Sequence, residues 1–392
     1  MGRSVTANGY QRGMNLCVNS PSRQRPSGKG ARKTRLPALV IFLAFAATAI
    51  LTGCKRSVSD VPIGQRVEIH PPLGLPPVPI PADNPPTADS IALGRKLFYD
   101  VRLSSDNSIS CASCHAPQMD FANRVSLSVG VAGKLGERNA PSIENAAYLP
   151  FQFWDGRASS LELQAVGPMA NPVEMAQPHE IAVSKLAKDE AYQAMFKKAF
   201  GTPDVTIGRI EKAIASFERT ILTGNSAFDR YQYGGDKTAL NAAQLRGIEV
   251  FKDPHRGNCA ACHTIDAHSA LFTDGKFHNT GEGVNSDGII IDVGRYHETK
   301  TETDTGAFMT PTLRNVANTA PYMHDGRLKT LEDVVDFYAG EGNSNPYLDK
   351  EMRTIALTGQ DRRDLVEFMK ALTGDLPPNV GPPENDRGTQ AK

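Results

Sequence analysis

Two segments of this chain place two cysteines and a histidine in the same order. Each reads Cys-x-x-Cys-His, in which the thiols can bond the vinyl groups of a porphyrin and the histidine can ligate its iron. A redox-active dithiol or half of a zinc site would explain the cysteines, but would leave the histidine of both copies without a role. The pattern therefore predicts two covalently bound c-type haems. Their attachment residues are Cys111, Cys114 and His115 in the first copy, and Cys259, Cys262 and His263 in the second.

The N-terminal segment has the composition of an export signal. Residues 1–53 contain eight Lys and Arg residues and no Asp or Glu, and the stretch 36–51 is apolar. A basic region, a short apolar region and small residues before a cysteine predict a signal peptide, with Met14 as an alternative start. The ending Leu51-Thr52-Gly53-Cys54 resembles the lipobox of bacterial lipoproteins, which implies that Cys54 is lipidated. The alternative is an ordinary signal peptide or a single anchoring helix, although 16 apolar residues are short for a membrane span.

The remaining cysteine and the charges agree with a periplasmic protein. Cys17 lies in the predicted signal peptide, so no thiol is left for a disulfide or a nucleophile. Since c-type haem is attached outside the cytoplasm, we expect a periplasmic lipoprotein, in the outer rather than the inner membrane, that meets the membrane only through its anchor. Without residues 1–53 the chain holds 35 basic and 43 acidic residues, a net charge of −8, which disfavours nucleic acid as a partner.

Apolar residues around the haem motifs recur at the spacing of α-helices, and no alternating run suggests a large sheet. The pairs Ser159…Glu162 and Thr330…Asp333 predict capped helix starts. The glycine-rich stretch 273–294 has no sustained period and is predicted to be a loop. The fold class is therefore mainly α with long loops. The predicted helical stretches are 91–98, 179–200, 204–222, 239–251, 330–338 and 361–372.

An internal repeat divides the chain into two related units. Residues 140–162 match residues 310–332, and in both copies the proline precedes an Asp-Gly-Arg sequence at the same distance without a gap. Each copy follows its own haem motif, so we expect two tandem cytochrome c-like haem domains. The predicted parts are a signal peptide (1–53), a Pro-rich linker (54–86), an N-terminal haem domain (87–235), a C-terminal haem domain (236–376) and a flexible tail (377–392).

Over residues 88–376 the chain resembles the bacterial di-haem cytochrome c peroxidase / MauG superfamily. The resemblance rests on both haem motifs together with five further sequences. These are Phe153-Trp154-Asp155-Gly156-Arg157, Gly167-Pro168 with Asn171-Pro172-Val173-Glu174-Met175, Pro311-Thr312-Leu313-Arg314-Asn315, Ala320-Pro321-Tyr322-Met323-His324-Asp325-Gly326, and Leu372-Thr373-Gly374.

The resemblance implies that the N-terminal domain is peroxidatic, with an open first haem, and that the C-terminal domain serves electron transfer. Typical di-haem peroxidases carry a histidine after a Ser-x-Gly, where it caps the iron, but here Val131 follows Ser128-Val129-Gly130. Haem one should then be bound by His115 alone and be open to H₂O₂; capping by another residue such as His179 is the alternative. Glu174 matches the superfamily's distal acid, which moves a proton between the peroxide oxygens, and Gln164 matches its hydrogen-bonding partner.

The resemblance also implies a distinctive second haem. Its distal ligand is expected 14 residues beyond His324, at Tyr338, where MauG has tyrosine and many peroxidases have methionine. The alternative is that Tyr338 is a core aromatic and that Met309 or Met323 binds iron. Trp154 resembles the aromatic residue that lies between the two haems and carries charge between them.

A calcium site is implied by the same resemblance. Asn139 and the carbonyls of Thr319 and Pro321 match the superfamily's Ca²⁺ ligands between the haems. Oxygen ligands without thiolates suit a hard cation.

The implied function is that of an H₂O₂-dependent, MauG-like di-haem oxidoreductase that uses high-valent haem iron to oxidise a residue of a periplasmic partner protein. MauG has a tryptophan just before its second haem motif, where Gly257 stands here. Either the partner docks differently or the substrate is not methylamine dehydrogenase. One alternative is a cytochrome c peroxidase that takes electrons from a cytochrome c or cupredoxin, and the second is a non-enzymatic di-haem electron carrier.

Overall fold

The structure is a computed structural model that describes residues 59–285, 287–340 and 342–383. All of them belong to the second of two compact units, which covers residues 57–392. The predicted signal peptide and the predicted lipidation site Cys54 lie outside the described residues. None of the described helices is both long and apolar enough to cross a membrane.

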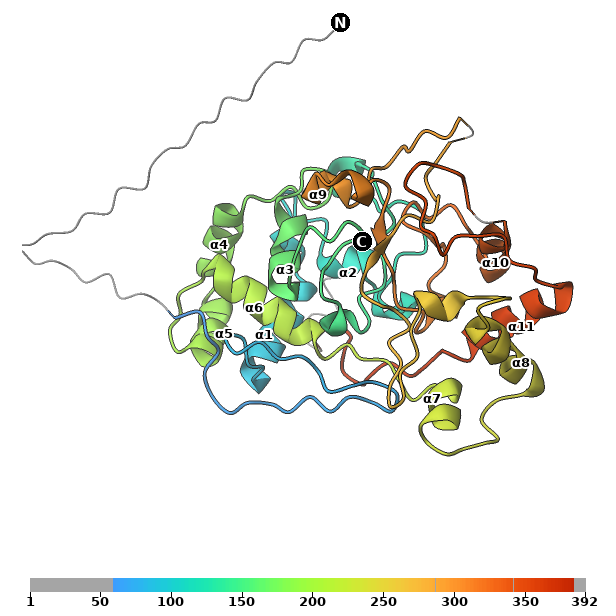
Figure 1. Ribbon diagram of the computed structural model, residues 1–392. Helices are drawn as coiled ribbons and strands as arrows, with labels where there is room; N and C mark the ends of the chain where they lie inside the picture. Colours follow the sequence, from blue (N-terminus) through green and yellow to red (C-terminus); the bar gives the residue numbers. More distant parts are fainter. Residues whose placement is uncertain (1–58, 286, 341, 384–392) are drawn as a thin grey trace, which may run out of the picture. The chain divides into compact units, whose positions relative to one another are not determined.

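The described chain is mainly α-helical, as predicted, with one antiparallel pair of two-residue strands (Figure 1). The helices are α1 (Ala88–Phe98), α2 (Cys111–Cys114), α3 (Leu161–Ala170), α4 (His179–Ala187), α5 (Glu190–Phe200), α6 (Ile207–Glu218), α7 (Ala227–Gln232), α8 (Ala242–Lys252), α9 (Tyr296–Thr299), α10 (Leu331–Ala339) and α11 (Gly359–Lys370). The strands are β1 (Phe277–His278) and β2 (Phe308–Met309).

Polar side chains fix where the helices of the repeat begin. The Thr330 side chain caps α10 by accepting a hydrogen bond from the Asp333 amide. The Asp333 carboxylate in turn accepts one from the Thr330 amide, as the sequence predicted. At α3 the prediction was wrong by one residue, because Ser160 rather than Ser159 accepts from the amide of Leu163. The two helices therefore start at equivalent positions of the repeat.

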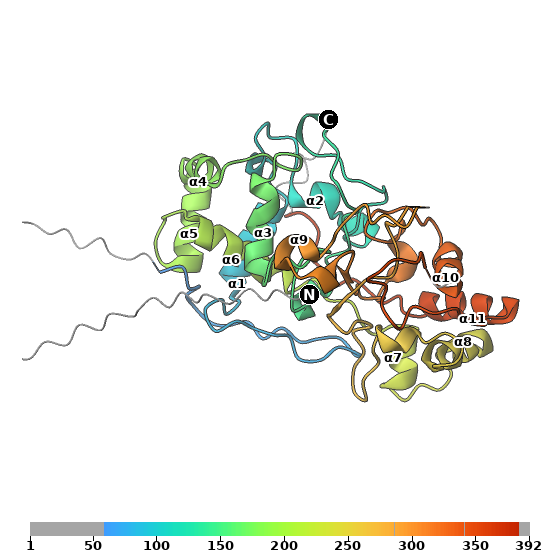
Figure 2. The same ribbon diagram turned by 45° about the horizontal axis from the view of Figure 1, so that its top comes forward.

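Each half has its own apolar core. The first forms mainly around α1, α3, α5 and α6, and the second around α7, α8, α10 and α11, as Figures 1 and 2 show. Glycines allow the closest helix contacts, since a Cβ on Gly94 of α1 would overlap the Ala213 carbonyl of α6. A Cβ on Gly247 of α8 would overlap the Asp364 carbonyl of α11 in the same way. The pair α8–α11 therefore repeats the pair α1–α6.

The repeat extends further than its sequence match suggested. Asn145 and Asn315 both have left-handed backbone conformations. Asn145 Oδ1 accepts from the Thr223 amide at 3.0 Å, and Asn315 Oδ1 accepts from the Gly374 amide at 2.7 Å. Each asparagine thus fixes a Leu-Thr-Gly sequence, 222–224 or 372–374, at the end of its own core.

The Pro-rich stretch is extended, as expected of a linker, yet it does not stand apart from the folded body. The carbonyl of Gly74 accepts from Arg314 Nη2 at 2.8 Å, and that of Pro76 accepts from the Tyr148 hydroxyl at 2.8 Å. The amide of Ile63 donates to the Ala199 carbonyl at 2.9 Å. The described part of this segment, from residue 59, therefore contacts both halves, because its backbone carbonyls and amides bond to groups of each half.

Contacts also cross the two other predicted boundaries. Helix α7 precedes the predicted boundary at residue 235, but its Phe228 packs against Phe272 and Phe368 in the second core. Residues 377–383 do not form a free tail, because the carbonyl of Val380 accepts from the Tyr99 hydroxyl at 2.6 Å. The chain thus returns to the first half, and residues 384–392 lie outside the described part.

Candidate functional site

A cavity of about 750 Å³ extends along residues of both haem motifs. Every site residue predicted from the sequence lines it. These are Cys111, Cys114, His115, Asn139, Trp154, Gln164, Glu174, Cys259, Cys262, His263, Thr319, Pro321 and Tyr338. Residues that are up to 227 positions apart in the sequence (111 to 338) are therefore brought to one continuous space.

The two motif histidines are held in the same way. His115 Nδ1 lies 3.1 Å from the Phe121 carbonyl, and His263 Nδ1 lies 2.8 Å from the Phe272 carbonyl. Since a carbonyl only accepts, each Nδ1 carries the proton and each Nε2 is left to ligate a metal. Burial lowers the pKa of both imidazoles, which favours the neutral form that ligation requires. Sequence reasoning missed these carbonyl partners, because any residue type supplies one.

The loops that carry those carbonyls are braced by equivalent hydroxyls. Ser142 donates to the Asp120 carbonyl at 2.7 Å, and Thr312 donates to the Leu271 carbonyl at 2.7 Å. Both hydroxyls follow the proline of the repeat. The repeat therefore positions the motif histidine of each haem site through an equivalent loop.

The cysteines suit covalent attachment. All four motif cysteines are free thiols at the cavity wall. Within the described residues no three His, Cys, Asp or Glu side chains converge as they would in a zinc site. A c-type haem needs only two thiols and one imidazole from each motif, so the residues present fit that group.

The loop that contains Gly130 and Val131 is hydrogen-bonded to the segment that carries the predicted acid, Glu174. The amide of Val131 donates to the Glu174 carbonyl at 2.8 Å, and a Cβ on Gly130 would overlap the Val173 carbonyl. Val131 is only 4% exposed. Val131 itself is not among the residues that line the cavity, so the open first haem stays a prediction. The alternative ligand His179 is not among the cavity-lining residues, and its Nε2 lies 2.8 Å from the Val166 carbonyl.

The Glu174 carboxyl is held in place, and its environment raises its pKa. Asn171 Nδ2 donates to its Oε1 at 2.7 Å, which fixes the side chain. Burial raises the pKa of Glu174, although the nearby Arg157 opposes that shift. Gln164 on α3 lines the same cavity.

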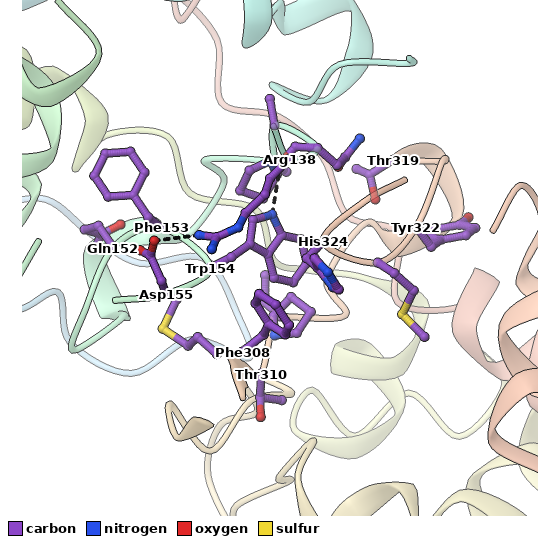
Figure 3. A pocket seen from close by; sticks show the side chains of 18 of the residues that line it. Arg138, Gln152, Phe153, Trp154, Asp155, Phe308, Thr310, Thr319, Tyr322 and His324 are labelled. Atoms are coloured by element: carbon purple, nitrogen blue, oxygen red, sulfur yellow. Dashed lines mark hydrogen bonds and ion pairs between the residues drawn. The ribbon is translucent and has the colours of Figure 1, made fainter. Parts of the chain in front are cut away.

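Trp154 lines the cavity that extends along both haem motifs. Its indole Nε1 donates to the Asn139 carbonyl at 2.9 Å, and its own carbonyl accepts from the Met309 amide at 2.9 Å. The ring meets His324 edge-on at a centroid distance of 6.5 Å, and His324 stacks on Phe308 at 3.7 Å. Figure 3 shows this aromatic group with Arg138 beside it.

Arg138 joins the two halves next to Trp154. Its guanidinium donates to both carboxylate oxygens of Asp292, at 2.7 and 2.8 Å. It also donates to Asp155 at 2.5 Å (Figure 3). Asp155 adjoins Trp154 in the sequence, while Asp292 comes from the second half. Sequence reasoning missed this link because the partners are 154 residues apart and neither belongs to a motif pair.

The second site contains the predicted tyrosine. Tyr338 on α10 lines the cavity and meets Phe337 edge-on at 5.4 Å, and burial raises the pKa of its phenol. Met309 and Met323, the alternative ligands, line the cavity as well. Met309 lies in β2, where its amide is bonded to Trp154 between the two sites.

The expected calcium ligands leave free oxygens. Asn139 Nδ2 donates to the Val125 carbonyl at 3.0 Å. In the part of the chain that the structure describes, no donor is assigned to Asn139 Oδ1 or to the carbonyls of Thr319 and Pro321. Oxygens of this kind suit a hard cation, and the calcium site stays a prediction.

Comparison with known proteins agrees with this architecture. Residues 88–238 match the family described as di-haem cytochrome c peroxidase, and residues 244–373 match the family described as cytochrome c. The cytochrome c551 peroxidase of Nitrosomonas europaea is 39% identical over 79% of this chain and 88% of its own length. The methylamine utilization protein MauG of Methylorubrum extorquens is 36% identical over 76% of this chain and 82% of its own.

A solved structure supports the same grouping. The crystal structure of a MauG-like protein associated with microbial copper homeostasis superposes with a TM-score of 0.70 at 32% identity, covering 78% of this chain and 95% of that one. Two haem motifs, two equivalent proximal loops and these relatives lead to one assignment. The chain belongs to the di-haem cytochrome c peroxidase / MauG family, whose members carry two covalently bound c-type haems.

Proposed function

We propose that this protein is an H₂O₂-dependent, MauG-like oxidoreductase that oxidises a residue of a periplasmic partner protein. One observation carries the proposal: Val131, a side chain that cannot ligate iron, is bonded through its amide to the segment of Glu174. A first site without a capping histidine is open to peroxide in every redox state of the protein. The haems, when bound, supply peroxide activation and electron storage.

The residues of the first site would move the protons. Asn171 fixes Glu174 Oε1, which leaves the other carboxylate oxygen to take a proton from the inner peroxide oxygen and return it to the leaving one. Gln164, which lines the same cavity, would orient the peroxide. Reduction of H₂O₂ to two waters consumes two electrons and two protons, which the oxidised residue of the partner supplies.

The remaining residues would link the first site to a store of oxidising equivalents. Trp154, which is held by hydrogen bonds to Asn139 and Met309, would carry charge between the two haems. Tyr338 would ligate the second haem and lower its potential relative to a methionine ligand. Ca²⁺ bound by Asn139, Thr319 and Pro321 would fix the geometry between the halves.

The proposed function can be tested by measuring whether the mass of a partner protein changes. Each candidate periplasmic protein is incubated with the haem-loaded protein and H₂O₂, and its peptides are then compared by mass spectrometry with a sample that lacks peroxide. We expect one partner to lose two hydrogens or gain oxygen at a single residue. Unchanged masses for every candidate would contradict the proposal.

The second candidate function is that of a cytochrome c peroxidase, favoured by the 39% identity to a cytochrome c551 peroxidase. Rapid steady-state oxidation of a reduced cytochrome c or cupredoxin by H₂O₂ would support it. A non-enzymatic electron carrier, the third possibility, would be supported by a ferric spectrum that does not respond to peroxide. We also propose that the protein is anchored in the periplasm as a lipoprotein through Cys54.

A further inference from the structure

The arginine of the Asp-Gly-Arg sequence is paired with a carboxylate in both halves. In the first half, Arg157 donates to Asp155 at 3.1 Å and lies over the Phe153 ring at 3.5 Å. In the second half, the equivalent Arg327 donates from Nη2 to Glu282 Oε2 at 2.6 Å. The second arginine has thus exchanged its local aspartate for a carboxylate 45 residues earlier in the chain.

Glu282 lies near Tyr338, since burial first and nearby negative charges, Glu282 among them, raise the pKa of that phenol. It comes from the loop that follows β1, is 3% exposed and lines the same cavity as Tyr338. Arg327 lies 6.0 Å over the Phe337 ring, and Phe337 meets Tyr338 edge-on at 5.4 Å. Contacts therefore run from Glu282 through Arg327 and Phe337 to Tyr338.

We propose that Glu282, held by Arg327, is a positioning residue for the second haem: the pair fixes the Tyr338 ring and places a buried negative charge beside the haem pocket. This inference rests on the proposed ligand role of Tyr338. Glu282 would thus contribute to the difference in reduction potential between the two haems that the proposed function requires.

The two members of the pair do not cancel in their effect on the haem. The side chain of Glu282 is 2% exposed, whereas that of Arg327 is 42% exposed, so water screens the arginine far more than the carboxylate. A carboxylate in a poorly solvated site stabilises the more positive, oxidised form of a nearby group. Glu282 should therefore make the second haem harder to reduce.

The test is the potential of each haem in Glu282→Gln, which removes the charge but keeps the shape of the side chain. We measure it by spectroelectrochemistry of the haem-loaded protein at pH 8.5, above the pKa of about 7 that burial gives Glu282. We expect reduction of the second haem to become about tenfold more favourable, the size of one charge acting over roughly 10 Å at an effective dielectric constant of about 20. The first haem is the internal control and should not shift.

Two further variants separate charge from structure. Glu332→Gln removes an exposed charge from the same helix, α10, and should leave both potentials unchanged. Arg327→Lys keeps the ion pair and should stay near the wild-type potential. An unchanged second haem in Glu282→Gln, or equal shifts of both haems, would overturn the inference. If the ferric wild-type spectrum lacks a tyrosine-ligated haem, the ligand assignment itself fails and the inference fails with it.

Discussion

Replacing Glu174 with glutamine should stop the proton shuttle while leaving the first site intact. Glutamine has nearly the volume of glutamate, and its Oε1 can still accept the 2.7 Å hydrogen bond from Asn171 Nδ2. The bond from the Val131 amide to the carbonyl of residue 174 involves only backbone atoms and is retained. The variant therefore loses only the ability to take up and return a proton.

The magnitude follows from the role of the carboxyl. Positioned acid–base groups contribute about 100- to 10,000-fold, so peroxide cleavage in Glu174→Gln should slow by about 100-fold or more, or roughly 2.7 kcal/mol in activation free energy. Because burial raises the pKa of Glu174, and the ionised form must accept the first proton, the wild-type rate should rise with pH through that pKa. The variant should lose this pH dependence.

The assay is stopped-flow absorption of the haem-loaded protein mixed with H₂O₂. Glu190→Gln, which neutralises an exposed glutamate of the same half outside the cavity lining, serves as the control and should keep the wild-type rate. A wild-type rate in Glu174→Gln, or a rate that keeps its rise with pH, would remove Glu174 from the mechanism.

Three further predictions follow from the second site and the buried charges. Tyr338→Met should raise the potential of the second haem and abolish long-lived oxidised states after peroxide treatment; spectroelectrochemistry that shows the wild-type potential would refute the ligand role. Arg314→Met should lower the free energy of unfolding by about 3–5 kcal/mol, because it leaves the buried Asp229 carboxylate unpaired, and denaturant titration measures the loss. Burial raises the pKa of Glu144 to about 9 from 4.5, so the folded state keeps a proton that the unfolded chain releases. The stabilisation is complete below pH 4.5 and is lost as pH rises toward 9, so between pH 4.5 and 7 the wild type should lose up to about 3 kcal/mol more than Glu144→Gln, and parallel pH curves would contradict this.

Which residues line the cavity could be predicted because most of them belong to short sequence motifs. The haem residues stand at fixed spacing, and the Pro, Asn and Asp-Gly-Arg residues of the repeat carry their own backbone and capping preferences. Thr330 and Asp333 show this directly, since their capping box follows from two side chains three residues apart.

The features that the sequence missed depend on partners without a local signature. Arg138 and Asp292 meet only after both halves have folded, and the proximal histidines use backbone carbonyls that any residue would provide. The same reason explains why the Pro-rich segment and residues 377–383 were expected to be free. Their carbonyls bond to Arg314, Tyr148 and Tyr99, which come from distant parts of the chain.

The most direct test of the account is the electron paramagnetic resonance spectrum of the ferric, haem-loaded protein, because it reports the ligands of both irons at once. An open first site with His115 alone predicts a high-spin signal for one haem. A second site with His263 and Tyr338 predicts a separate histidine–tyrosinate signal that disappears in Tyr338→Met. Two low-spin signals of the histidine–histidine or histidine–methionine type would contradict the account.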